Sequence, residues 1–149
     1  MRARPMISAS ATIGLTEAIE SAGGDPDRIL RSHGLDRAAL QKPDGFIPCS
    51  DFAGVLEEAA RATGDDCFGL HFGERYNPKN IGPYAYVVLN SPTIAAGLRN
   101  AGRYLRVHNE AASVSFVTEG RFAYARHLLA DLGVENPRQN NEYAMAVGV

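Results

Sequence analysis

Residues 47–108 read IPCSDFAGVLEEAARATGDDCFGLHFGERYNPKNIGPYAYVVLNSPTIAAGLRNAGRYLRVH, and this stretch decides the fold. Its apolar spacing predicts a helix that Ser50 caps and that ends at Gly64, where glycine allows a left-handed backbone. The expected buried face of this helix is Phe52, Val55, Leu56, Ala59 and Thr63. A shorter helix is expected within residues 65–77.

The second half of this stretch predicts two more helices. Residues 81–90, IGPYAYVVLN, are apolar on all sides of a helix, and we therefore expect this helix to be buried. Ser91 or Thr93 caps the next helix, because Pro92 keeps the chain out of the helical region before it. Its expected core face is Ile94, Leu98, Ala101 and Leu105. The opposite face carries Arg99, Arg103 and Arg106, which either meet solvent, bind an anionic effector or contact another domain.

Towards the amino end, the chain predicts short helices with clear stop signals. One helix covers residues 15–22 and ends at Gly23, and a second begins at Asp25 and closes at Gly34. Residues 42–48, KPDGFIP, are expected to form a loop. Residues 1–15 imitate a signal peptide, but polar residues interrupt their apolar run, and we interpret them as a frayed tail that enters a helix.

Towards the carboxyl end, the periodicity changes from helix to strand. Residues 113–127 alternate in the manner of a β-hairpin that turns at Glu119 and Gly120. Residues 138–149 predict a terminal helix whose expected inward residues are Tyr143, Ala144 and Val147. The predicted fold class is therefore α+β, a helix-rich domain with several short helices, a hairpin near 113–127 and a terminal helix. Because a lone hairpin is marginal in water, it needs helices or further strands against it.

Composition excludes several classes of protein. With 149 residues, 45% hydrophobic and 21% charged, the chain suits one soluble domain. Its net charge of −2 and its pI of about 6.1 disfavour a free-standing nucleic-acid binder, which needs a basic surface. No run approaches the roughly 18 apolar residues of a membrane span. Cys49 and Cys67 lack metal-ligand spacing and are expected to be reduced thiols of a cytoplasmic protein.

The candidate ligand-binding residues are tyrosines, histidines and one arginine. No histidine has the i, i+4 partner of a metal site, no nucleophile motif occurs, and we expect no catalytic residue, metal or cofactor. A buried tyrosine is either core packing with a bonded hydroxyl or a polar group in an apolar effector pocket. Tyr84 and Tyr86 are two residues apart, so they point to nearly opposite sides of a helix and cannot line one cavity together. The candidates are Tyr84, Tyr86, His71, Arg103 and His108.

The stretch 47–108, together with GLTEAIESAGGDPDRILRSHGLD before it and VSFVTEGRFAYARHLLA and RQNNEYAMAVGV after it, resembles the amino-terminal effector domain of AraC-type transcription regulators of the "arabinose-binding" branch. The resemblance implies a domain, here residues 1–149 and incomplete, that binds a small-molecule effector and forms a homodimer. It also implies that DNA is bound only through a carboxyl-terminal helix-turn-helix module, which this sequence does not include. Two alternatives stay open: a dimerisation module without ligand, and a small enzyme or cofactor-binding domain.

Overall fold

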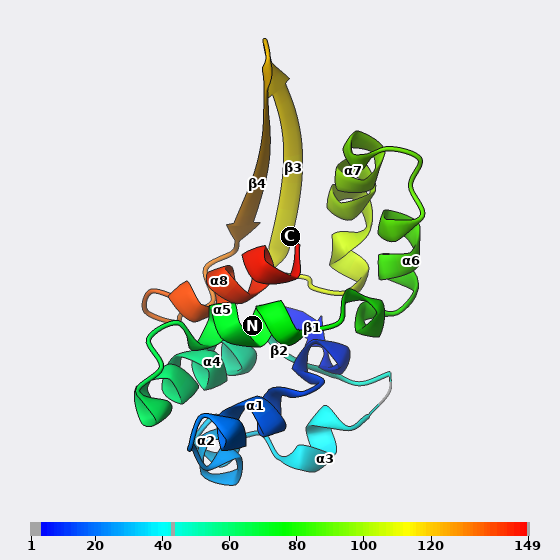
Figure 1. Cartoon of the computed structure of the whole chain (residues 1–149). Helices are drawn as coiled ribbons and strands as arrows, with labels where there is room; N and C mark the ends of the chain where they lie inside the picture. Colours follow the sequence, from blue (N-terminus) through cyan, green and yellow to red (C-terminus); the bar gives the residue numbers. More distant parts are fainter. Residues whose placement is uncertain (1–3, 43, 149) are drawn as a thin grey trace.

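A computed structural model of the chain describes residues 4–42 and 44–148. In chain order the elements are β1 (Met6–Ser8), η1 (Ala9–Thr12), α1 (Leu15–Ser21), α2 (Pro26–Ser32), α3 (Arg37–Leu40), β2 (Phe46–Pro48), α4 (Cys49–Thr63), α5 (Phe68–Arg75), η2 (Pro78–Ile81), α6 (Pro83–Leu89), α7 (Ile94–Tyr104), η3 (Leu105–Val107), β3 (Ala112–Glu119), β4 (Phe122–Leu129) and α8 (Arg138–Val147). A helical body carries the core, while α6, α7 and the β3–β4 hairpin extend from it (Figure 1). The α+β, helix-rich prediction is confirmed.

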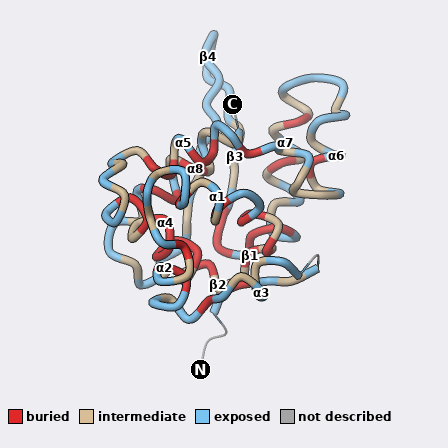
Figure 2. The backbone as a smooth tube through the Cα atoms, turned by 60° about the horizontal axis from the view of Figure 1, so that its bottom comes forward, coloured by how far each residue is buried: buried red, intermediate tan, exposed pale blue. Residues whose placement is uncertain are grey.

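The core lies where α1, α2, α4, α5 and α8 meet (Figure 2). The predicted inner face of α4 is confirmed at Phe52, Val55, Leu56 and Ala59, which are fully buried, whereas Thr63 is only half-buried. Tyr143 of α8 enters the same core and stacks on Phe72 of α5, with ring centroids 5.1 Å apart. The terminal helix therefore closes the body, although it is separated from α5 in the sequence by the whole hairpin.

The amino-terminal segment is a strand and a 3-10 helix, and its interpretation as a frayed tail is wrong for residues 6–12. β1 pairs antiparallel with β2, so that Ile7 lies opposite Ile47 and both are buried. Part of the expected loop 42–48 is thus strand β2. The pairing joins residues about forty positions apart in the chain, and local patterns carry no signal for such contacts. Residues 1–3, 43 and 149 lie outside the described residues.

Helix boundaries follow the expected caps in most places. Asp25 accepts a hydrogen bond from the backbone N–H of Arg28, and Thr93, rather than Ser91, caps α7 in the same way. The expected cap of α4 is wrong, because that helix begins at Cys49 after Pro48. The backbone N–H of Cys49 donates to the Pro5 carbonyl, and this bond continues the β1–β2 pairing into the first turn of α4.

Helix α6 is largely exposed, which contradicts the predicted burial of residues 81–90. Tyr86 is 67% exposed and Leu89 is 57% exposed, and Ala85 is the fully buried residue of this helix. On α7, Ile94 is 84% exposed and Leu98 is half-buried, so the expected core stripe is buried only at Ala101. The reason is that α6 packs on α7 and η2, and α7 packs on α6 and β3, whereas no other element of the described chain covers their outer sides.

The hairpin is confirmed, with β3 and β4 paired from Ala112↔Leu129 to Glu119↔Phe122. Gly120 holds a φ of 60° in the two-residue turn, a conformation that favours glycine. The strands stand away from the helical body at their turn end (Figure 1). In the part of the chain that the structure describes, no helix is long and apolar enough to cross a membrane.

Candidate functional site

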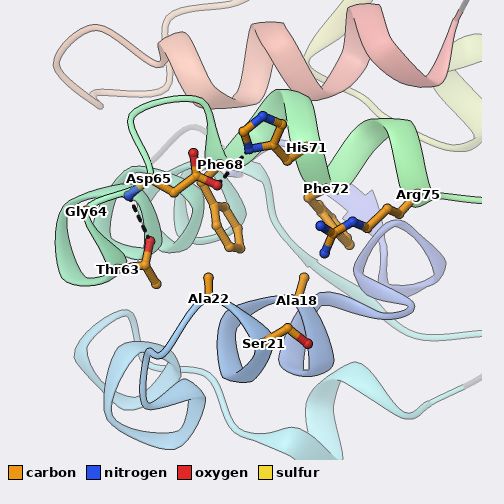
Figure 3. Close-up of a pocket in the computed structure, with 10 residues that line it drawn as sticks. All are labelled: Ala18, Ser21, Ala22, Thr63, Gly64, Asp65, Phe68, His71, Phe72 and Arg75. Atoms are coloured by element: carbon orange, nitrogen blue, oxygen red, sulfur yellow. Dashed lines mark hydrogen bonds and ion pairs between the residues drawn. The ribbon is translucent and has the colours of Figure 1, made fainter.

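A groove of about 320 Å³ lies between α1 and α5, beside the end of α4 (Figure 3). Across it, Phe68 and Phe72 of α5 face Ala18 of α1 and Ala22, which directly follows α1. Both phenylalanines also belong to the buried core, so packing against the core holds this wall of the groove in place. The polar residues around the groove are Ser21, Thr63, Asp65, His71 and Arg75.

The turn between α4 and α5 positions the acidic end of this groove. Gly64 ends α4 with a φ of 73°, in the left-handed region. The backbone N–H of Asp65 then donates to Thr63 Oγ1, and Asp65 Oδ1 accepts from the backbone N–H of Cys67. These bonds fix the Asp65 carboxylate at the start of α5, where the positive end of the helix dipole favours it.

A hydrogen-bonded His–Asp pair and an arginine set the electrostatics of the groove. His71 Nδ1 lies 2.8 Å from Asp65 Oδ2, and this hydrogen bond holds the pKa of Asp65 below its ordinary value. Arg75 lies one helical turn further along α5, and within the described residues its guanidinium forms no ion pair or side-chain hydrogen bond. The arrangement offers a free guanidinium and a His–Asp pair above an apolar floor, which suits a small molecule with an anionic group.

Two of the predicted ligand residues meet outside this groove. The rings of Tyr84 on α6 and His108 stack with centroids 6.2 Å apart and an interplanar angle of 3°. The Tyr84 hydroxyl donates to the carbonyl of Ala101 on α7 (3.3 Å), so its phenol group has a partner in the fold. This contact joins α6, α7 and the segment that leads into the hairpin.

His108 is buried without a partner for one of its ring nitrogens. Its Nδ1 atom is inaccessible and has no hydrogen-bond partner among the described residues. Burial lowers the pKa of His108 to about 4 and raises the pKa of Tyr84 to about 12, so both side chains are neutral at pH 7. A neutral imidazole and a neutral phenol give this place no charge with which to hold an ionic ligand.

The remaining predicted residues lie in other places. His71 is the one candidate that lines the α1–α5 groove. Tyr86 points to solvent, and Arg103 is exposed and lies over the ring of its neighbour Tyr104, with its guanidinium carbon 5.8 Å from the centroid. The structure therefore separates Tyr84 from Tyr86, as the helical spacing predicts, and does not bring the five candidates into one site.

Sequence reasoning missed the other groove residues. A signal existed on α5, where Phe68, Phe72 and Arg75 lie on one helical side after Asp65. The opposite wall, however, is α1, which precedes α5 by more than forty residues, and nothing local in either segment indicates that they face each other.

Two further hollows are less suited to an anionic ligand. One of about 420 Å³ lies near η1 and α3, where Arg37 already pairs with Glu20 and Asp27. The other, of about 300 Å³, contains Arg138, which pairs with Asp66 and Glu142. Within residues 4–42 and 44–148, no group of three or more His, Cys, Asp or Glu side chains is placed to hold a metal ion.

Comparison with known proteins identifies the family of this chain. The model of the family described as "Arabinose-binding domain of AraC transcription regulator, N-term" matches residues 23–149. The chain is also similar to the "HTH-type transcriptional regulator VirS" of two Mycobacterium tuberculosis strains, at 29% identity over 146 residues. That alignment covers 95% of this chain, and the chain spans 42% of the length of these relatives.

Proposed function

The chain belongs to the family of amino-terminal arabinose-binding domains of AraC transcription regulators, and on this premise we propose that it binds a small-molecule effector in the α1–α5 groove and forms a homodimer. The family match over residues 23–149 is the observation that carries the proposal. Both curated relatives are transcription regulators, a class that generally lacks enzymatic activity and that acts in the cytoplasm.

The groove suggests the chemistry of the effector. Arg75 is free to make two parallel hydrogen bonds to a carboxylate or phosphate. His71 and Asp65 add a donor and an acceptor, and the phenylalanine floor accepts a short apolar part. A volume of about 320 Å³ corresponds to a metabolite of modest size, so we expect a small organic acid or amino acid rather than a long-chain lipid.

The position of the groove supports a route from ligand to the rest of the domain. A ligand wedged between α1 and α5 presses on α5, and the far side of α5 packs against α8 through Gly69 and Gly73. A shift of α5 would therefore move α8. In a two-state mechanism the effector favours one arrangement of these helices, and attached DNA-binding modules respond to it.

Thermal shift measurements test the effector site. The chain is screened against amino acids, organic acids, sugars and fatty acids, and a true effector well above its dissociation constant raises the unfolding midpoint. Arg75→Ala is expected to abolish this shift, whereas Arg99→Ala, which removes an exposed arginine of α7, is expected to retain it. A shift that survives Arg75→Ala contradicts the groove assignment.

A dimerisation module without ligand is the second candidate function. It is favoured by large apolar side chains exposed on α6 and the hairpin, among them Leu89, Phe122 and Leu128. Patches of this kind mark protein interfaces. A dimer in sedimentation experiments, combined with no thermal shift from any compound class, would favour this second function over effector sensing.

A further inference from the structure

Helix α5 begins without a side-chain cap from its own N-terminal residue. The first four backbone N–H groups of a helix have no partner within it, and a side chain just before the helix commonly accepts from one of them. The residue before α5 is Cys67, and its side chain makes no such bond. The backbone N–H of Gly69, in the first turn, is buried and therefore needs a partner from another segment.

That partner is Gln139, the second residue of α8. Its Oε1 atom accepts the Gly69 N–H (2.7 Å), and its Nε2 atom donates to the carbonyl of Asp66, in the turn just before α5 (2.8 Å). The approach depends on Gly69, because a Cβ at that position would collide with the Gln139 backbone. One side chain of α8 thus bonds both the first turn of α5 and the turn that precedes it.

The backbone of Gln139 is tied to a third helix. Its N–H donates to Glu57 Oε1 on α4 (2.7 Å), and the whole residue is 3% exposed. Neighbouring Arg138 pairs with the Asp66 carboxylate at the surface (3.2 Å). Moving α8 away from α4 and α5 would therefore break the three hydrogen bonds of Gln139 together, and buried polar groups would lose their partners.

The turn that Gln139 bonds also carries the acidic end of the α1–α5 groove. Asp65, which directly precedes Asp66, accepts the Cys67 N–H at its Oδ1 atom (3.1 Å). Its Oδ2 atom lies 2.8 Å from His71 Nδ1 (Figure 3). Both bonds of Asp65 depend on the conformation of this turn and of the first turn of α5. Since Gln139 bonds to both turns, it holds the backbone that places the Asp65 carboxylate.

From these contacts we infer that Gln139 is a positioning residue for the groove, because it caps α5 from α8 and thereby keeps the Asp65–His71 pair in place. Docking of α8 and formation of this pair are then one cooperative event. The regulatory consequence rests on the proposed function: a ligand that binds Asp65 and His71 favours the docked position of α8. By reciprocity, loss of α8 docking weakens the ligand site.

The pKa of Asp65 tests this positioning role without any ligand. The hydrogen bond from His71 holds that pKa below its ordinary value of 3.8. Gln139→Met keeps the length of the side chain but removes both of its hydrogen bonds. We expect the pKa of Asp65 to rise towards 3.8 in this variant, as measured by NMR titration of the carboxyl carbon. An unchanged pKa in folded Gln139→Met overturns the inference.

Tyr143→Phe is the matched control on α8. It breaks a hydrogen bond from the same helix to the Ala11 carbonyl (3.0 Å), and this bond lies outside the turn that carries Asp65. We therefore expect a loss of stability without a rise in the pKa of Asp65. An equal rise in both variants would mean that general loosening of α8, and not the cap from Gln139, displaces Asp65, and it would overturn the inference.

Native-state hydrogen exchange of the parent chain is a second test, which does not depend on the folding of a variant. If Gln139 joins α5 to α8, the Gly69 amide opens only when α8 leaves the body. We expect the amides of Gly69 and Tyr143 to share one opening free energy and to respond equally to low urea. A Gly69 amide that exchanges while the α8 amides stay protected overturns the inference. Neither test uses a ligand, so failure of the groove in the thermal shift screen is a separate outcome.

Discussion

The backbone of Gly69 on α5 lies directly against the backbone of Gln139 on α8. The Gly69 N–H donates to Gln139 Oε1 (2.7 Å), and a Cβ at Gly69 would collide with the Gln139 carbonyl. The other polar groups of Gln139 are also bonded, since its side-chain amide donates to the Asp66 carbonyl (2.8 Å) and its backbone N–H donates to Glu57 Oε1 (2.7 Å). This buried glutamine therefore fixes how α8 sits on the body.

Gly69→Ala is expected to lower the free energy of unfolding by about 1–3 kcal/mol, because an added methyl group forces α5 and α8 apart. Gly148→Ala is the control, since a Cβ there meets its nearest neighbours at an ordinary 3.5 Å. Urea melts measure both variants. A neutral Gly69→Ala would show that the two helices separate at little cost.

Tyr143→Phe is expected to destabilise the chain by about 1–3 kcal/mol, because it leaves a buried acceptor without its donor. The Tyr143 hydroxyl donates to the Ala11 carbonyl (3.0 Å), and Ala11 is fully buried. Tyr86→Phe is the matched control, since Tyr86 is exposed and should change stability by less than about 0.5 kcal/mol. Equal losses in thermal or urea melts would contradict this role of the hydroxyl.

Acid is expected to destabilise the chain through His108. Burial lowers its pKa to about 4, below its ordinary 6.5, so the unfolded chain binds the proton more readily than the folded chain. The stability that depends on neutral His108 is complete above pH 6.5 and is lost as the pH falls towards 4, at up to about 1.4 kcal/mol per pH unit. The lowered pKa of His127, which is also due to burial, adds a loss of the same sign.

His108→Phe keeps an aromatic ring beside Tyr84 and removes this titration. Urea melts at several pH values between 4 and 7 should show a shallower decline for the variant than for the parent chain. An unchanged slope would mean that His108 does not control the acid sensitivity.

On α7, Leu98→Ala is expected to cost about 1–2 kcal/mol, less than the 2–5 kcal/mol of a fully buried leucine, because Leu98 is half-buried. Ile94→Ala and Arg103→Ala should each stay within about 0.5 kcal/mol, since both residues are exposed. Denaturant melts of the three variants compare the faces directly. Equal losses at Leu98 and Arg103 would contradict the orientation of α7.

Residues 1–149 alone are expected to show no sequence-specific DNA binding at physiological salt. The net charge of −2 and the pI of about 6.1 disfavour DNA binding, which needs a concentrated basic surface to neutralise phosphates. A gel shift with nanomolar specific binding by this chain would contradict the prediction.

Local signals in the sequence determined the positions of most helices and of the hairpin. Asp25 and Gly64 set helix ends because caps and left-handed turns depend on neighbours within about four residues. The alternation near the turn at Gly120 likewise identified the β3–β4 pair. The family, too, was evident from the sequence, and the match over residues 23–149 confirms it.

Only the tertiary structure decided what covers each element. The apolar helix α6 was expected to be buried, yet Leu89 is exposed because no described element packs on that side. The pairing of Ile7 with Ile47, the contact of Gly69 with Gln139 and the groove between α1 and α5 all join residues that are distant in the chain. Periodicity shows that a helix has an apolar face, but the partner of that face is set by packing between distant segments, which no local pattern encodes.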